Sequence, residues 1–368
     1  MKSLYRTRLR NVALLLIAAC AMMALLAGCS GTSDQKSSGA DASNLEKTDF
    51  NLGYLNSTAH LFAFVAQEEG FFADEGLNVN LTQFSSSSEL ESGLQSGKLD
   101  VAFISTVPTF TFASKGSDIS IFGGAMTNGH GYVIKPQYTE GLTDWDVSLL
   151  KDRNVASVKN SIQDAELQQL LAEKNIKIGD GAGEVHVKYF DSQKDAYAAL
   201  KNAEIDAASV YSPYASLAEK EGYKVVYRCS EEPTLQNQPC CRQVALTSAL
   251  QENPNSYTAF ERAIIKAYLF SQTDHDKTIQ DIKKYIDIDE DAINTEVYGG
   301  YGTSYPDPDT KASFELKQNI VKLGYTPDFD ETSHYNTDIY KTALDEVTAA
   351  DPNNDLVKEL NDHFANAN

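Results

Sequence analysis

Two segments of this chain, about a hundred residues apart, follow the same order of secondary-structure signals. In the first, a helix expected over 89–96 leads into a buried strand over 99–104. In the second, a helix expected over 194–201 leads into a buried strand over 205–210. An acidic residue lies at the start of each strand, and polar residues with a proline one or two positions later end it. Because the two segments repeat one α/β unit, the sequence predicts two similar α/β lobes.

Two such lobes predict where a ligand would bind. In an open α/β sheet, ligands lie beyond the carboxyl ends of the strands, where loops and helix N-termini converge. Two lobes that face each other form a cleft, and a hinge between them lets the cleft close around a ligand. We therefore expect an interlobe binding site rather than a flat surface.

The size and charge of the chain agree with this architecture and exclude some functions. With 368 residues and 42% hydrophobic residues, the chain is long enough for two lobes. It has 31 basic and 52 acidic residues, a net charge of −21. Nucleic-acid affinity depends mainly on Lys and Arg at phosphates, so this balance argues against a nucleic-acid partner.

The N-terminus has the pattern of an export signal. Basic residues up to Arg10 precede an apolar run over 12–27, which is shorter than the roughly 20 residues of a membrane-spanning helix. The run ends at Gly28-Cys29, which resembles the bacterial lipobox. That resemblance implies cleavage before Cys29 and a lipid on its thiol. An ordinary cleavage site with a chance cysteine is the alternative.

Several further motifs together resemble a known family. They are "EEGFFADEGL", "SGKLDVAFISTVP", "NAEIDAASVYSP" and "PCCRQVALTSAL". They are similar to segments of the nitrate/sulfonate/taurine-type substrate-binding proteins of ABC importers, a group that is also similar to thiamine-pyrimidine precursor binders and synthases. The resemblance runs from about residue 50 to about residue 345.

The resemblance implies a fold, a function and partners. The fold would be the two-lobed periplasmic-binding-protein fold of the second type, α/β, with two mixed sheets flanked by helices. The protein would capture a small polar or anionic solute and deliver it to an ABC permease and its ATPase. It would be a monomer without a cofactor, anchored by lipid at the outer face of the cell membrane. A synthase-like enzyme and a sensor without a transporter are the alternatives. The export signal and the lack of the synthases' denser run of cysteines argue against the enzyme.

The same reasoning divides the chain into six parts. The expected parts are a signal peptide over 1–28, a flexible tether over 29–47, lobe 1 over 48–134, lobe 2 over 135–232, a return to lobe 1 over 233–260, and a C-terminal helical region over 261–368. The tether is rich in Ser, Gly, Asp and Ala, which is typical of a flexible linker.

The candidate ligand-binding residues lie at expected strand ends, at helix starts and at the second crossing between lobes. They are Asn56, Ser57, His60, Ser85, Ser86, Ser105, Thr106, Thr127, Asn128, Ser161, Tyr211, Tyr214, Cys241 and Arg242. Hydroxyls and free N–H groups at helix starts suit an oxyanion. For any one Ser or Thr, simple helix capping is the alternative.

Three candidates carry a more specific hypothesis. We expect Arg242 to contact an anionic solute through its guanidinium, with an ordinary salt bridge as the alternative. If the solute is a neutral ring, Tyr211 and Tyr214 would stack on it; interlobe packing is the alternative for these two side chains.

The cysteines suggest one disulfide at most. After cleavage and lipidation, Cys229, Cys240 and Cys241 would remain, and an odd number leaves one thiol free. Cys229 and Cys240 span a short loop that a disulfide could close. The chain has no Cys-x-x-Cys pair, so we predict no metal site.

Overall fold

A computed structural model of the protein describes residues 44–368. The predicted signal peptide, the predicted lipidation site Cys29 and most of the predicted tether lie outside the described residues. Within 44–368, no helix is both long enough and apolar enough to cross a membrane.

The first of two sheets has six strands in the order β11-β4-β10-β3-β1-β2. β1 runs parallel to β2 and β3, whereas β10 runs antiparallel to β3 and β4. We call this sheet and the helices packed on it lobe 1. Its strands are β1 (Asp49–Tyr54), β2 (Asn78–Gln83), β3 (Val101–Ser105), β4 (Ile119–Asn128), β10 (Pro239–Leu246) and β11 (Gly302–Ser304).

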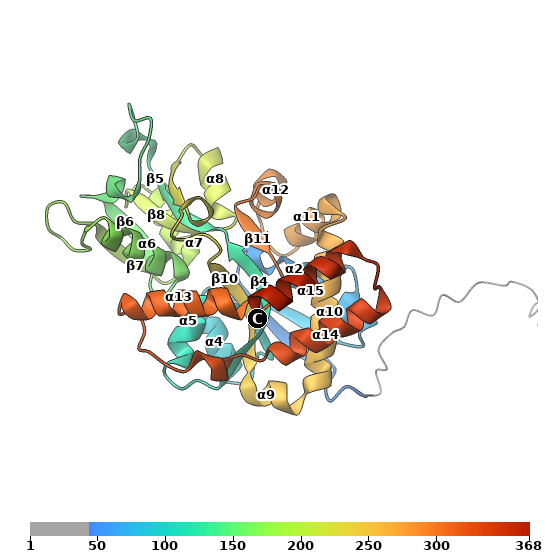
Figure 1. Cartoon of the computed structure of the whole chain (residues 1–368). Coiled ribbons are helices and arrows are strands. Elements are labelled where there is room, and N and C mark those ends of the chain that lie inside the picture. Colours follow the sequence, from blue (N-terminus) through green and yellow to red (C-terminus); the bar gives the residue numbers. More distant parts are fainter. Residues whose placement is uncertain (1–43) are drawn as a thin grey trace, which may run out of the picture. The chain divides into compact units, whose positions relative to one another are not determined.

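The second sheet has five strands in the order β7-β6-β8-β5-β9. β6 runs parallel to β7 and β8, and β5 runs antiparallel to β8 and β9. We call this part lobe 2; it is drawn mainly in green in Figure 1. Its strands are β5 (His130–Ile134), β6 (Asn154–Val158), β7 (His186–Phe190), β8 (Ala207–Tyr211) and β9 (Lys224–Arg228). The predicted α/β fold with two mixed sheets is confirmed.

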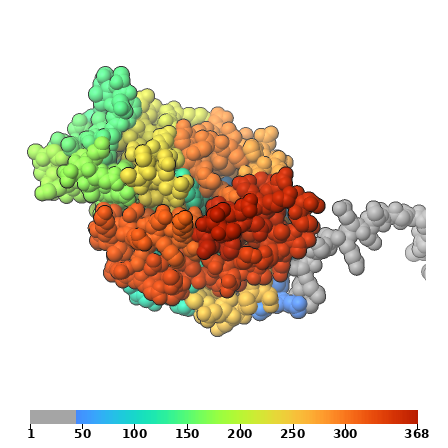
Figure 2. Space-filling model, in the orientation of Figure 1, coloured from blue at the N-terminus to red at the C-terminus, as the bar shows by residue number. Residues whose placement is uncertain are grey.

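The helices flank both sheets. Lobe 1 includes α2 (Leu61–Glu68), α3 (Phe71–Asp74), α4 (Ser87–Gln95), α5 (Thr106–Ala113), α9 (Thr247–Glu252) and α10 (Pro254–Ser271). Lobe 2 includes α6 (Ile162–Glu173), α7 (Gln193–Lys201) and α8 (Tyr214–Lys220). The C-terminal helices are α11 (His275–Lys283), α12 (Glu290–Tyr298), α13 (Thr310–Lys322), α14 (Thr337–Ala350) and α15 (Asp355–Ala367). In Figure 2, residues of this C-terminal region (orange to red) form much of the face turned to the viewer.

The first crossing between the sheets lies earlier than the sequence predicted. β4 ends at Asn128 and β5 of the second sheet begins at His130, so the boundary expected after Ile134 is wrong. Asn128 and Gly129 have φ values of 62° and 84°, a left-handed turn that redirects the chain. The polar segment Thr127-Asn128-Gly129 between the two apolar strands marks this turn in the sequence, and the boundary should have been placed there. The second crossing lies between Arg228 and Pro239.

The C-terminal region is also more than a set of helices. Its residues Gly302–Ser304 form β11, which pairs with the edge of β4 in the lobe 1 sheet. α12 contacts α8, so the same region also reaches lobe 2.

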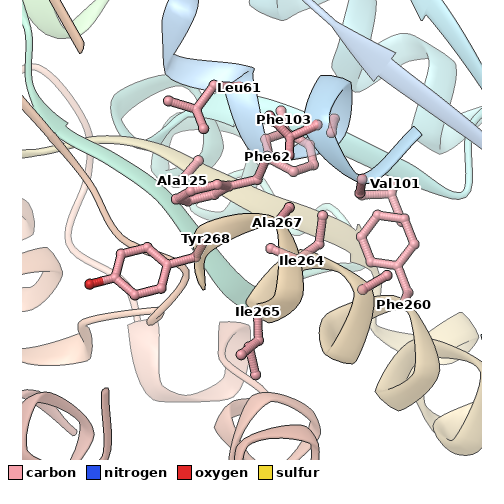
Figure 3. Close-up of a cluster of buried hydrophobic side chains, with 14 of the residues drawn as sticks. Leu61, Phe62, Val101, Phe103, Ala125, Phe260, Ile264, Ile265, Ala267 and Tyr268 are labelled. Carbon is pink, nitrogen blue, oxygen red and sulfur yellow. The ribbon is translucent and has the colours of Figure 1, made fainter. Parts of the chain in front are cut away.

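The lobe 1 core is centred on one aromatic residue of α10. The ring of Phe260 lies 5.7 Å from Phe50, 5.0 Å from Phe72 and 6.2 Å from Phe122, measured between ring centroids. Figure 3 shows Phe260 and Ile264 of α10 among side chains of β3 and α2. α10 packs against α14 on its other side. This core fixes the strands whose ends form the site described next.

Candidate functional site

A cavity of about 490 Å³ lies between the two lobes. Residues at or just after the ends of β1, β2 and β3 line it from lobe 1, and residues at or just after the ends of β6, β7 and β8 line it from lobe 2. These are the carboxyl ends of the parallel strands in each sheet. The cavity therefore occupies the position at which open α/β sheets bind their ligands.

Helix N-termini converge on the same cavity. Ser86, Ser161 and Ser192 line it and begin α4, α6 and α7. Their hydroxyls accept hydrogen bonds from backbone N–H groups three residues on, at 3.2, 3.1 and 3.1 Å. The capping role is thus present, and the same side chains also face the cavity. Helix N-termini favour negative charge, so this arrangement suits an anionic group.

Two lobe 1 side chains at the cavity have polar atoms without a partner. The hydroxyl of Ser105, which precedes α5, is buried and makes no hydrogen bond to a described residue. The backbone N–H of Leu55 donates to Nδ1 of His60 at 3.0 Å, so the ring hydrogen lies on Nε2. Nε2 has no partner among the described residues. Both groups can donate a hydrogen bond to a solute.

The cavity has few charged groups. Lys159, Glu89 and Asp191 are exposed residues of its lining, and no arginine among the described residues lines it. An anion bound here would depend on hydroxyls, backbone N–H groups and His60 rather than on a guanidinium group.

The structure brings eight of the fourteen predicted ligand-binding residues to the cavity. These eight are Ser57, His60, Ser85, Ser86, Ser105, Ser161, Tyr211 and Cys241. The structure places the other six outside its lining, namely Asn56, Thr106, Thr127, Asn128, Tyr214 and Arg242. The prediction that these six face the solute is not supported by their positions.

Arg242 is the clearest correction. Its side chain is 2% exposed and lies in the interior of lobe 1. Nε donates to the carbonyl of Pro308 at 2.9 Å, and one terminal NH₂ donates to the carbonyls of Met126 and Cys241 at 3.0 and 2.9 Å. Cys241 lines the cavity, whereas the side chain of its neighbour Arg242 does not and is held by these three carbonyls instead. Its function is to join β4 and β10 to the segment before α13.

The remaining residues outside the cavity have structural partners. The amide of Asn56 donates to the hydroxyl of Tyr214 at 2.9 Å, a contact between lobe 1 and lobe 2. The interlobe-packing alternative is therefore the one that fits Tyr214. The hydroxyl of Thr106 donates to the carbonyl of Cys240 at 3.4 Å. Asn128 belongs to the left-handed turn at the first crossing, and Thr127 pairs with Thr303 of β11.

Sequence reasoning missed several lining residues. From lobe 2 they are Phe190, Asp191, Ser192 and Gln193, together with Lys159, Asn160 and Gln163. The repeat could have found Ser192, because it occupies the same position before its helix as Ser86 does in the first unit. No signal in the sequence indicated Lys159 or Gln163.

The predicted disulfide is not formed. Cys229, Cys240 and Cys241 are all free thiols. The sulfur nearest to that of Cys240 belongs to its neighbour in sequence, since the two Sγ atoms of Cys240 and Cys241 are 3.3 Å apart. Cys229 instead lies in the lobe 2 core, where its sulfur accepts a hydrogen bond from the backbone N–H of His130 at 3.5 Å.

A buried pair of side chains, His130 and Glu166, lies beside Cys229. Nδ1 of His130 lies 2.9 Å from the carboxylate of Glu166, and both side chains are almost fully buried. Burial alone would lower the pKa of His130, but the charges of Cys229 and Glu166 raise that pKa well above its usual value. These three residues are close enough to hold a metal ion together, a grouping that their spacing in the sequence did not indicate.

Comparisons with known proteins agree with this geometry. The NMT1-like family matches residues 43–286, more than half of the chain. A Bacillus subtilis protein, provisionally named an aliphatic sulfonates-binding protein, is 26% identical over 288 residues, which cover 76% of this chain and 80% of that protein.

Two solved structures illustrate the shared fold. The periplasmic nitrate-binding protein NrtA from Synechocystis PCC 6803 has a TM-score of 0.70 at 17% identity, covering 83% of this chain and 91% of that one. The periplasmic aliphatic sulphonate binding protein SsuA from Escherichia coli has a TM-score of 0.64 at 16% identity. The match covers 78% of this chain and 92% of that one. The likeness to these structures establishes the periplasmic-binding-protein fold.

Proposed function

This chain belongs to the NMT1-like family, and from that premise we propose that it is the solute-binding component of an ABC importer. The solute is a small molecule with an anionic head group of the sulfonate or nitrate class. The protein captures it between the lobes and delivers it to a permease with its ATPase. The relatives named above are solute-binding proteins, which supports binding rather than catalysis.

The observation that carries this proposal is the convergence of six strand ends and several helix N-termini on one cavity. The anionic head group accepts hydrogen bonds from the free donors, Ser105 Oγ and His60 Nε2, and from backbone N–H groups at the helix starts. The apolar lining, which includes Leu55, Phe190 and Tyr211, packs against the rest of the solute. Hydroxyls and helix N-termini thus replace the arginine that the sequence suggested.

Capture depends on groups from both lobes. Ser57 and Ser105 belong to lobe 1, whereas Ser161 and Ser192 belong to lobe 2. A solute that bonds to both sets binds the closed arrangement more tightly than an open one, and so shifts the population toward closure.

We propose further that the protein is exported and retained by a lipid on Cys29. The support is the signal-like segment over 1–28, followed by the lipobox-like Gly28-Cys29 and the tether over 29–47. The mature chain would carry 27 basic and 52 acidic residues, so attraction to anionic lipid would not hold it at a membrane. The protein then acts as a monomer at the outer face of the cell membrane.

The anchor is tested by Cys29→Ala expressed in a bacterial host. We expect the variant in the soluble fraction or as uncleaved precursor, whereas the wild-type chain sediments with membranes. A variant that stays membrane-bound with a normally cleaved N-terminus would show that the lipid anchor is wrong.

The solute class is tested by thermal unfolding of residues 44–368 with a panel of nitrate, taurine, ethanesulfonate and a hydroxymethylpyrimidine. A true ligand at a hundred times its Kd stabilises the folded state by about 2.7 kcal/mol. Ser105→Ala should weaken binding of the ligand by about 1.5–3 kcal/mol, because it removes a hydrogen bond to a charged group.

Ser96→Ala is the matched control, since Ser96 ends α4 outside the cavity and bonds only to its own helix. If Ser105→Ala and Ser96→Ala bind the ligand equally well, the cavity is not its site. If only the pyrimidine stabilises the protein, the anionic class is wrong.

A further inference from the structure

Two neighbouring cysteines face the same cavity, which is unusual for residues in a strand. Successive side chains of a regular strand point to opposite faces. Cys240 and Cys241 nevertheless both line the cavity, and their sulfurs are 3.3 Å apart. The pairing of β10 with β4 shifts register between Pro239 and Arg242, and an irregularity of this kind re-aims side chains. The irregularity therefore places two thiols side by side at the solute.

The surroundings of the pair favour thiolate chemistry at one of its members. The hydrogen bond with Cys240 holds the pKa of the Cys241 thiol well below its usual range, against the opposing effect of burial. The same hydrogen bond, together with burial, raises the pKa of the Cys240 thiol. A thiolate is the nucleophilic form of cysteine, so Cys241 is the attacking sulfur and Cys240 the resolving one.

Other titratable groups near the pair belong to lobe 2 and to the first crossing. The charge of His130 lowers the pKa of Cys241, and the charges of Cys229 and Glu166 raise the pKa of Cys240. Tyr211 also lies near the two sulfurs. Burial raises the pKa of its hydroxyl, and the charges of the two sulfurs act in the same direction. Cys229 is itself part of the lobe 2 core and does not line the cavity.

We propose that Cys240 and Cys241 form a reversible vicinal disulfide in the wall of the solute cavity, with small-molecule disulfides as the oxidant. The Cys241 thiolate attacks one sulfur of the oxidant, a new S–S bond forms, and the first thiol leaves as its thiolate. The sulfur of Cys240, after losing its proton to solvent, attacks Cys241 and expels the second thiol. One oxidant disulfide is reduced to two thiols, and the protein dithiol is oxidised to one disulfide.

Oxidation has a consequence for binding, which rests on the proposed function. When Cys241 is ionised, the dithiol presents a negative charge to the cavity, whereas the disulfide is neutral. An anionic solute should therefore bind more tightly to the oxidised protein, since a like charge near its head group has been removed.

Disulfide formation is tested without any solute. The protein is equilibrated with mixtures of reduced and oxidised glutathione, alkylated under denaturing conditions and digested. The mass of the peptide that contains residues 240 and 241 is then measured by mass spectrometry. In oxidising mixtures we expect this peptide to lose two hydrogens and take no alkyl group. In reducing mixtures it should take two alkyl groups.

Cys229→Ala is the matched control and should behave as the wild-type protein does. Cys240→Ser and Cys241→Ser should each leave one cysteine that becomes glutathionylated instead. Two alkylated cysteines in the most oxidising mixture, or a bridge from either residue to Cys229, would overturn the proposal. Circular dichroism of each variant confirms that it is folded before its peptides are compared.

The effect on binding is measured by calorimetry with ethanesulfonate as the probe. We expect the oxidised protein to bind it several-fold more tightly than the reduced one, and the double variant Cys240→Ser/Cys241→Ser to bind independently of the glutathione mixture. Equal binding by both forms refutes the effect on affinity. If ethanesulfonate binds neither form, the proposed solute class fails, while the peptide masses still decide whether the disulfide forms.

Discussion

Lobe 1 and lobe 2 contribute similar groups to the cavity but differ in what lies behind those groups. On both sides, serines follow strand ends and precede helices. Behind the lobe 1 strands lies a large aromatic core built around Phe260, over which the C-terminal helices pack. Lobe 2 has less such cover, and the three large hydrophobic residues that are exposed within 44–368, namely Leu142, Ile178 and Tyr189, all lie in this lobe.

This difference gives the two similar lobes different roles in the stability of the protein. The residues after β10 add most of the helices that thicken lobe 1, so lobe 1 is the stable body of the protein. Lobe 2 has smaller clusters of buried side chains and is joined to lobe 1 through two crossings and contacts such as Asn56–Tyr214. We therefore expect stability to be concentrated in lobe 1.

The largest expected loss of stability comes from a substitution in the lobe 1 core. Phe260→Ala should lower the free energy of unfolding by about 3–5 kcal/mol, because it leaves a cavity among packed aromatic rings. Leu142→Ala, at a side chain that is 47% exposed in lobe 2, should change it by less than about 0.5 kcal/mol. Urea unfolding at fixed temperature measures both. Similar losses for the two variants would contradict the contrast between the lobes.

A smaller effect is expected at Arg242, and it separates stability from binding. Arg242→Ala leaves three buried carbonyls without their donor and should cost about 2–3 kcal/mol of stability. Solute affinity, measured by calorimetry well below the melting temperature, should remain unchanged.

Arg153→Ala provides the comparison in lobe 2. Arg153 lies over the ring of Tyr138 at 4.2 Å and is half-buried, so its loss should cost less than about 1 kcal/mol. A large loss of solute affinity in Arg242→Ala, with little loss of stability, would restore the role that the sequence suggested.

The smallest expected effect is a pH dependence in lobe 2. The hydrogen bond from Lys174 lowers the pKa of Asp146 from 3.8 to about 2. The folded-state pKa lies below the unfolded one, so this pair stabilises the protein above about pH 4, and the stabilisation is lost as the pH falls toward 2. Because the Asp146 side chain is 44% exposed, solvent screening limits its contribution to a few tenths of a kcal/mol.

Asp146→Asn should therefore reduce stability slightly at pH 6 and not at pH 2, as measured by urea unfolding. Asp180→Asn is the control, since Asp180 is exposed and has no ion pair with a described residue. A loss of stability in Asp146→Asn that is equal at both pH values would rule out this ion pair as its cause.

The site could be predicted from the sequence where it depends on the repeat. Ser86 and Ser161 precede helices that follow parallel strands, and the carboxyl ends of such strands must meet at one edge of their sheet. His60 follows β1 in the same way. The prediction failed at Arg242 because the face to which a side chain of β10 points depends on the register of that strand. It failed at the first crossing because the turn at Asn128-Gly129, although marked by polar residues, does not tell by itself whether the next strand joins the same sheet or another one.

The sequence by itself determined the fold class, the two lobes and the kind of groups that line the cavity, because these depend on local periodicity and on the order of strands and helices. Only the tertiary structure decided which of the candidates share the cavity and which neighbours pair within it. The separation of Cys229 from Cys240, the burial of Arg242 and the addition of β11 to the lobe 1 sheet all depend on contacts between distant segments. Such contacts follow from packing and strand register, which no local pattern records.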